Sequence, residues 1–300
     1  MHLPTVTHDL PHADLHAHPH AVSRLRAARL ARSTKPFLAR GGNKGERCDG
    51  CRLLPSHCMC ALRPALATQA GFCLVMADIE PIKPSNTGWL IADVVPDTFA
   101  FGWARTATDP ALLALLADPQ WQPYVVFPGE YATPERVVSG LLTDDGPAPA
   151  SSVPPGALRG APHATAWAPG ASEGTTERRL ARPLFVLLDA TWSEARKMFR
   201  KSPYLDRLPV LSLQPEQLSR YRLRRSTRDD HFCTAEVAAL CLALAGEHHA
   251  AQTLEAYLDV FTRRYLLAKQ QLPLLPADAV DVRLAVLAKT GAGATALAGA

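Results

Sequence analysis

The chain has 300 residues, a formal net charge of +4 and a hydrophobic content of 47%. These values fit one large globular domain, with or without appendages, and supply enough apolar residues for a core. No stretch approaches the roughly 20 consecutive apolar residues that cross a bilayer, and the N-terminus lacks the charged-then-apolar order of a signal peptide. The sequence therefore predicts a soluble, cytoplasmic protein.

Residues 1–45 are rich in His and Arg. A His-rich tract can bind a metal ion. Here, however, the His residues are irregularly spaced and the hydrophobicity is low, which favours a disordered tail. We assign no function to this segment.

Four Cys lie close together in residues 46–66, as a Cys-x-x-Cys pair followed by Cys-x-Cys. In a cytosolic chain such pairs indicate a metal site more often than a disulfide, and Zn²⁺ prefers four tetrahedral ligands, usually thiolates in structural sites. The expected ligands are Cys48, Cys51, Cys58 and Cys60. His57 is an alternative fourth ligand. A redox pair is a further alternative, although no thioredoxin-like pattern surrounds it.

The apolar stretches 72–76 and 124–127 predict strands. The first is followed by Asn86-Thr87-Gly88, a turn that would present backbone N–H groups ahead of a helix beginning near residue 89. Taken alone, these three residues are more typical of a plain turn than of a ligand-binding loop. Residues 109–116 predict a helix, with Pro at its first position.

Residues 183–213 predict a strand, a helix and a second strand. The apolar run 184–188 is typical of a strand buried on both faces, and Asp189 follows at its carboxyl end. Thr191 or Ser193 would cap the helix that continues through residue 199. Because open α/β sheets bind ligands at the carboxyl ends of their strands, Asp189 and Trp192 are candidates for a site. The alternative is that Asp189 caps the helix and Trp192 packs beneath it.

Residues 143–182 are dominated by Pro, Ala, Gly, Ser and Thr, which predicts a flexible insertion. Further along, Thr234 would cap a helix over about 235–245, with Glu236 near its positive end. A second helix is expected over 254–270. The remainder, 276–300, is expected to be a C-terminal tail with weak helical character.

Lys and Arg are concentrated on both sides of the central unit, and such clusters attract phosphate. The alternative for each cluster is an ordinary solvated face. The candidates for RNA contacts are Arg196, Lys197, Arg200, Lys201, Arg222, Arg224 and Arg225.

The sequence Asp189-Ala-Thr191-Trp192 resembles the signature of the DTW-domain family, which comprises tRNA-uridine aminocarboxypropyltransferases. Three further motifs agree in order with that family: the cysteine pairs, the Ser85–Gly88 segment and Thr234-Ala-Glu236. The resemblance covers about residues 46–270, apart from the insertion. The chain departs from the family at Cys233, where Ser is usual, and at Asp78 and Lys83, where His and Arg are frequent.

The resemblance implies a SPOUT-like α/β domain over residues 67–275, with a knotted C-terminal part and a preceding zinc module. It also implies transfer of the 3-amino-3-carboxypropyl group from S-adenosylmethionine to N3 of a uridine in tRNA. In that interpretation the catalytic residues are Asp189, Thr191 and Trp192, and the cofactor-binding residues are Asn86, Thr87, Gly88, Thr234 and Glu236.

Two other functions remain open at this point. A SPOUT-type RNA methyltransferase would use the same cofactor but transfer its methyl group. A non-catalytic, zinc-containing RNA-binding module would need no carboxylate inside a basic surface, where it opposes phosphate. The presence of Asp189 therefore favours catalysis. A ribosomal RNA substrate also remains an alternative to tRNA.

Overall fold

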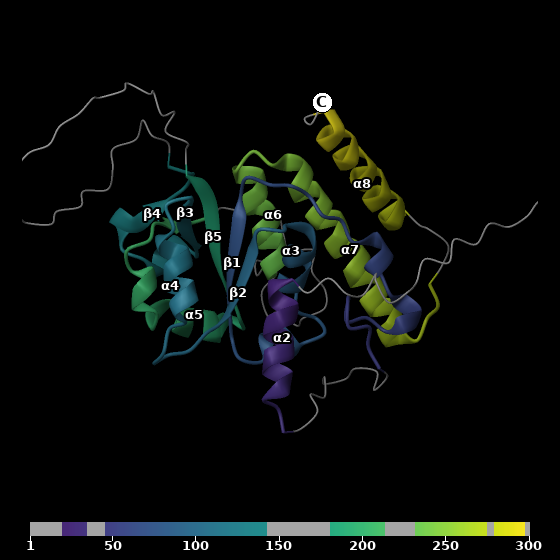
Figure 1. Cartoon of the computed structure of the whole chain (residues 1–300), viewed down its shortest axis with the longest axis horizontal. Helices are drawn as coiled ribbons and strands as arrows, with labels where there is room; N and C mark the ends of the chain where they lie inside the picture. The colour runs from purple at the N-terminus through teal and green to yellow at the C-terminus, as the bar shows by residue number, and fades with distance from the viewer. Residues whose placement is uncertain (1–19, 35–45, 143–180, 214–231, 275–278, 298–300) are drawn as a thin grey trace, which may run out of the picture.

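A computed structural model describes residues 20–34, 46–142, 181–213, 232–274 and 279–297 (Figure 1). The described strands form one six-stranded parallel sheet in the order β2-β1-β5-β3-β6-β4. They are β1 (Gly71–Met76), β2 (Thr98–Gly102), β3 (Trp121–Val126), β4 (Val137–Val138), β5 (Arg182–Asp189) and β6 (Val210–Leu211). The predicted α/β class is confirmed, although the short strand β4 was not predicted.

Helices cover both faces of this sheet (Figure 1). One face carries α4 and α5, and the other carries α2, α3, α6 and α7, with α8 outermost. The helices are α2 (Ala21–Ala31), α3 (Gly88–Val94), α4 (Pro110–Ala117), α5 (Trp192–Arg200), α6 (Thr234–Leu244), α7 (His248–Gln270) and α8 (Ala279–Leu297). Short 3-10 turns occur at Pro55–His57, Cys60–Leu62, Glu80–Ile82, Gly129–Tyr131, Pro134–Arg136 and Pro203–Leu205.

The two faces of the sheet carry two separate apolar cores. Along β1, Phe72, Leu74 and Met76 belong to one core, while Cys73 and Val75 belong to the other. This alternation follows from the two-residue period of a strand. Because every residue of β1 is buried, the strand appears in the sequence as an unbroken apolar run, as expected for a parallel sheet covered on both faces.

Strand β5 lies at the centre of the sheet, between β1 and β3. Its pairing with β1 places Met76 opposite Asp189, so these two strands end at the same level. The loops that follow them, and the loop after β3, therefore meet at one edge of the sheet, as the βα arrangement requires.

Helix α2 lies within the segment that was expected to be disordered. Val22 is fully buried, and α2 packs against β2 and α3. Arg29 forms two hydrogen bonds of 2.8 Å to the carboxylate of Asp78. The prediction of disorder over 1–45 is therefore wrong for residues 20–34, while residues 1–19 and 35–45 lie outside the described part of the chain.

The C-terminal segment forms a docked helix rather than a tail. Leu284 of α8 is 2% exposed, and Asp281 lies 3.2 Å from Arg264 and 3.5 Å from Arg263 of α7. The predicted helix over 254–270 is confirmed but begins earlier, at His248.

The predicted insertion and the predicted knot also involve residues outside the described ranges. The expected insertion lies there as far as residue 180, and Arg182 already belongs to β5. Residues 214–231, which connect β6 to α6, are also outside, so the C-terminal knot stays a prediction. Among the described helices, none combines the length and the apolar character needed to span a membrane.

Candidate active site and metal centre

Asp189 lies at the carboxyl end of the central strand, and its side chain joins two distant segments. The residue is fully buried. Its Oδ2 accepts a hydrogen bond of 2.6 Å from the Asn86 side-chain amide, and its Oδ1 accepts one of 2.7 Å from the Thr234 hydroxyl. The predicted site residues of three separate motifs thus meet at one carboxylate.

The Asn86-Thr87-Gly88 turn packs directly against this carboxylate. A Cβ atom on Gly88 would lie 2.6 Å from Asp189 Oδ2, so any other residue here would have to push the buried, hydrogen-bonded carboxylate aside, and this close approach favours glycine. The Asn86 side chain also accepts a hydrogen bond from the Trp89 backbone N–H at 3.2 Å. Thr87 Oγ1 accepts one from the Ala235 backbone N–H at 3.3 Å. The turn is therefore fixed on both sides.

Helix α6 begins at this point, but not with the predicted cap. Cys233 is the N-cap residue, and its backbone N–H donates to Glu236 Oε2 at 2.8 Å in a capping box. Thr234 is the first helical residue, which frees its hydroxyl to bind Asp189. Burial and then the nearby Glu236 carboxylate raise the pKa of the Cys233 thiol. The thiol is therefore a poor nucleophile.

Helix α5 is capped by Thr191, as predicted. The Thr191 hydroxyl lies 2.5 Å from Glu194 Oε2, and its backbone N–H donates to the same carboxylate at 3.2 Å. The Thr191 hydroxyl lowers the pKa of Glu194. Since Thr191 provides the cap, the alternative interpretation of Asp189 as the capping residue is wrong. The second candidate cap, Ser193, is inside the helix.

Trp192 lies at the surface on a platform of aromatic side chains. It is 37% exposed and stacks on Phe127 with 5.5 Å between ring centroids and 13° between ring planes. Tyr131 meets its edge at 5.8 Å, and Phe199 stacks on Phe127 at 4.5 Å. The alternative that Trp192 packs beneath the helix is therefore wrong.

Phe127 and Tyr131 were not predicted as site residues. Both follow β3, which pairs with β5, so the sheet order brings them beside Trp192. The one feature of the sequence that could have indicated these two residues is the turn that follows the predicted strand 124–127.

The four predicted cysteine ligands converge. All four Sγ atoms lie within 4.8 Å of one another, and the shorter separations are 3.5 Å, 3.7 Å and 3.8 Å. A tetrahedral Zn²⁺ with bonds of about 2.3 Å holds its sulfurs about 3.8 Å apart. The spacing and the thiol ligands therefore suit a metal ion such as zinc.

His57 is not a fourth ligand. One of its ring nitrogens lies 2.9 Å from Ser56 Oγ and the other lies 2.9 Å from the Leu272 carbonyl oxygen. The alternative ligand set with His57 is therefore wrong. The ring instead connects the cysteine-containing segment 46–66, called the metal module below, to Leu272 just after the end of α7.

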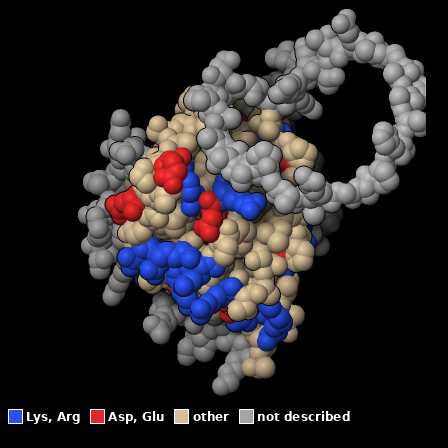
Figure 2. Space-filling model, turned by 90° about the vertical axis from the view of Figure 1, so that its left-hand side faces the viewer, with Lys and Arg blue, Asp and Glu red and all other residues tan. Residues whose placement is uncertain are grey.

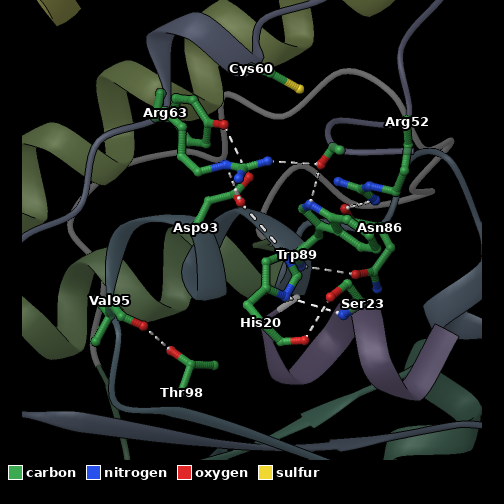
Figure 3. Close-up of polar contacts among 12 residues, drawn as sticks. His20, Ser23, Arg52, Cys60, Arg63, Asn86, Trp89, Asp93, Val95 and Thr98 are labelled. Atoms are coloured by element: carbon green, nitrogen blue, oxygen red, sulfur yellow. Dashed lines mark hydrogen bonds and ion pairs between the residues drawn. The ribbon is translucent and has the colours of Figure 1, made fainter. Parts of the chain in front are cut away.

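The metal module is joined to α3 by a buried polar cluster (Figure 3). The Gly50 carbonyl accepts hydrogen bonds from Trp89 Nε1 at 3.0 Å and from Arg63 at 3.2 Å. Arg63 Nε lies 2.8 Å from Asp93 Oδ1, and the Tyr257 hydroxyl donates to Asp93 at 3.0 Å. Burial raises the pKa of Asp93 to about 7 in spite of Arg63.

His20 belongs to the same cluster, and its pKa is shifted down, whereas that of Asp93 is shifted up. Its pKa is lowered from 6.5 to about 3 by burial and, to a smaller extent, by Arg52, Arg63 and Arg24. The 3.5 Å contact of His20 with Asp93 is therefore made by a neutral imidazole at pH 7 and is not an ion pair. His20 also accepts the Ser23 backbone N–H at 3.2 Å, capping α2.

We expect His20→Asn to reduce acid sensitivity. Between the ordinary pKa of 6.5 and the folded value of about 3, the unfolded chain binds an extra proton, so the native state loses stability as pH falls. The variant keeps an N-cap and should gain up to about 1.4 kcal/mol per pH unit relative to the unsubstituted protein in this window. Urea denaturation from pH 4 to 8 measures the difference. The raised pKa of Asp93 makes stability depend on pH in the opposite direction. Because Asp93 is present in both proteins, its contribution cancels in the difference, which therefore reports His20. A difference that is constant with pH would contradict the assignment.

The exposed face of α5 is basic. Arg196, Lys197, Arg200 and Lys201 are all exposed. Figure 2, which views the side of the molecule that carries α4 and α5, shows Lys and Arg gathered in a band across its lower half. The other predicted RNA contacts, Arg222, Arg224 and Arg225, lie outside the described residues.

A family model described as the DTW domain matches residues 45–266. The match includes the cysteine cluster, the turn at residues 86–88, the central strand and the start of α6. Helices α2 and α8 fall outside it. No solved structure matches the chain.

Proposed function

Because the chain belongs to the DTW-domain family, we propose that it transfers the 3-amino-3-carboxypropyl group from S-adenosylmethionine to N3 of a uridine in tRNA. The family supports a tRNA-modifying transferase, which also fits the cytoplasmic location expected from the sequence. In the reaction, a bond forms between N3 and the γ-carbon of the group. The bond from that carbon to sulfur breaks, its electron pair stays on sulfur, and methylthioadenosine leaves.

The observation that carries this proposal is the position of Asp189, between the turn and the first residue of α6. N3 of uracil is a poor nucleophile until its proton is removed. A carboxylate that takes this proton contributes about 10²- to 10⁴-fold to the rate. Since Asp189 is fully buried, the uridine must displace the Thr234 hydroxyl to reach Oδ1, whereas Oδ2 stays bound to Asn86.

The groups around Asp189 suit the co-substrate. S-adenosylmethionine carries a positive sulfonium and an ammonium group, and Asp189 and Glu236 place carboxylates at the start of α6. We assign Asn86, Thr87, Gly88, Thr234 and Glu236 to its binding. Trp192, which is partly exposed and already stacked on Phe127, offers an aromatic face for a base or for the adenine. The zinc ion is structural in this proposal, because the sulfonium itself activates the reacting carbon.

We propose that the basic face of α5 binds the RNA backbone, since its exposed cations attract phosphate without reading sequence. The paired substitution Lys197→Glu and Arg200→Glu should raise KM for tRNA at least about tenfold and lower the slope of log affinity against log salt by about 2. Filter binding at several salt concentrations measures this slope. Lys289→Glu is the control, because Lys289 is an exposed base on α8, at the other side of the molecule (Figure 1). Equal effects of the paired substitution and the control would contradict the assignment.

The deciding experiment is incubation of the purified protein with S-adenosylmethionine and an unmodified tRNA transcript. Nucleoside mass spectrometry and the release of methylthioadenosine are the measurements. A uridine carrying an aminocarboxypropyl group supports the proposal. S-adenosylhomocysteine together with a methylated base would make the protein a methyltransferase, and tRNA binding without either product would favour a non-catalytic RNA-binding module. A parallel incubation with ribosomal RNA tests the other substrate.

A further inference from the structure

Arg52 directly follows the metal ligand Cys51 and points out of the metal module into the domain (Figure 3). The residue is 1% exposed and has a φ of 64°. A left-handed backbone is unfavourable for a side chain of this size. It is held here by two hydrogen bonds across the ligand loop, from Arg52 N to Cys48 O at 2.7 Å and from Cys48 N to Leu53 O at 2.8 Å. The fold of the ligand loop therefore fixes the direction of the Arg52 side chain.

The guanidinium of Arg52 holds the segment that leads into the Asn86–Gly88 turn. It lies 4.5 Å from the centre of the Trp89 ring and 5.4 Å from that of Phe261. Its Nη1 donates to the Asn86 carbonyl oxygen at 2.8 Å and lies 3.4 Å from the carbonyl oxygens of Lys83 and Pro84. One planar cation thus contacts both the turn and the first residues of α3.

Asn86 links Arg52 to Asp189, because its backbone carbonyl oxygen binds Arg52 and its side chain binds Asp189. The same residue donates its amide to Asp189 Oδ2 at 2.6 Å and accepts from the Trp89 N–H at 3.2 Å. An unbroken series of bonded groups therefore leads from the ligand loop through Arg52 and Asn86 to Asp189.

We propose that Arg52 is a positioning residue through which the metal centre sets the Asn86–Gly88 turn and, through it, the Asp189 carboxylate. The inference rests on the proposed function for its catalytic consequence, but the structural coupling can be tested without it. Arginine suits this role because its flat guanidinium stacks on the Trp89 ring while Nη1, in the same plane, donates to the Asn86 carbonyl oxygen. A lysine keeps the charge but lacks the flat surface that stacks on Trp89.

The test is hydrogen exchange of the backbone amides in residues 86–92. In Arg52→Met these amides should exchange about 10- to 100-fold faster, the range expected for the loss of a hydrogen bond from a charged donor. Arg52→Lys should fall between this variant and the unsubstituted protein. Arg47→Met is the matched control, because the Arg47 guanidinium lies over Tyr265 and donates to the Arg52 carbonyl rather than to the turn. The control should leave exchange at residues 86–92 unchanged.

Removal of the metal with a chelator, in the unsubstituted protein and in Arg52→Met, tests whether the two changes act through the same contacts. Relative to the amides of β1, which report the global loss of stability, metal removal should accelerate exchange at residues 86–92 in the unsubstituted protein. It should add little to this relative rate in Arg52→Met, because both changes break the same series of contacts. Full additivity, normal exchange in Arg52→Met, or equal acceleration in Arg47→Met would overturn the proposal.

A kinetic measurement separates positioning from general support of the fold. In Arg52→Met, KM for S-adenosylmethionine should rise at least about tenfold while KM for tRNA stays the same, with partial recovery in Arg52→Lys. A parallel rise in both KM values would indicate a merely structural role. Because exchange is measured on the protein alone, a failure of the proposed transfer reaction would leave the exchange result interpretable.

Discussion

Asp189→Asn is expected to lower kcat by about 10²- to 10⁴-fold while leaving the fold intact. An asparagine at this position can still accept a hydrogen bond from the Asn86 amide, and its own amide can donate to the Thr234 hydroxyl. The two contacts of Asp189, at 2.6 Å and 2.7 Å, are therefore both retained. What is lost is the ability to take a proton. Single-turnover rates with saturating S-adenosylmethionine and tRNA measure the loss.

Thr234→Val is the control for Asp189→Asn, because it removes one anchoring hydrogen bond but leaves the carboxylate. We expect it to reduce kcat much less than Asp189→Asn does. If Asp189→Asn retained the original kcat, Asp189 would be an anchor for the turn and α6 and not the general base. Asp189→Ala could not make this distinction, since it removes the base and both anchoring contacts together.

Cys60→Ser is expected to abolish stoichiometric zinc binding and to lower the free energy of unfolding by about 4 kcal/mol or more, as the loss of a structural metal does. Cys60 is buried, and its Sγ lies 3.5 Å from that of Cys48. A shift of the loop therefore cannot bring another ligand into the place of the Cys60 thiolate. Metal analysis after gel filtration and thermal unfolding measure the two effects.

Cys233→Ser is the matched control for the metal centre. Cys233 caps α6 and lies outside the cysteine cluster, and serine is a favourable N-cap residue. This variant should bind the same amount of zinc as the unsubstituted protein and unfold at a similar or higher temperature. Equal zinc content in Cys60→Ser would contradict the four-thiolate site.

The sequence predicted the parts of the site whose signal is local. The buried strand that ends at Asp189 appears as an apolar run, and the metal module appears as closely spaced cysteines. In both cases the pattern that gives the prediction lies within one short segment. The contacts of Asp189 with Asn86 and Thr234 join segments that are 103 and 45 residues away, and only the resemblance to a family had grouped them.

The parts that were missed depend on tertiary packing. Helix α2 has Val22 as its buried residue, too weak a pattern to separate it from a solvated basic segment. Arg52 and Asp93 are buried charged residues. Arg and Asp are usually exposed, so their burial cannot be predicted unless their partners are known. Phe127 and Trp192 stack because β3 and β5 are neighbours in the sheet, an order that the sequence does not contain.

The strand order also determines when the protein can fold during synthesis. β1 pairs with β2 and with β5, and Leu184 to Asp189 emerge from the ribosome more than a hundred residues after the strand they complete. The nascent chain must therefore carry β1 with one side unpaired while the intervening residues are made. Such a topology is slow to form and exposes strand edges. We expect the metal module, whose ligands span only residues 48–60, to be the first part of the nascent chain able to reach its final structure.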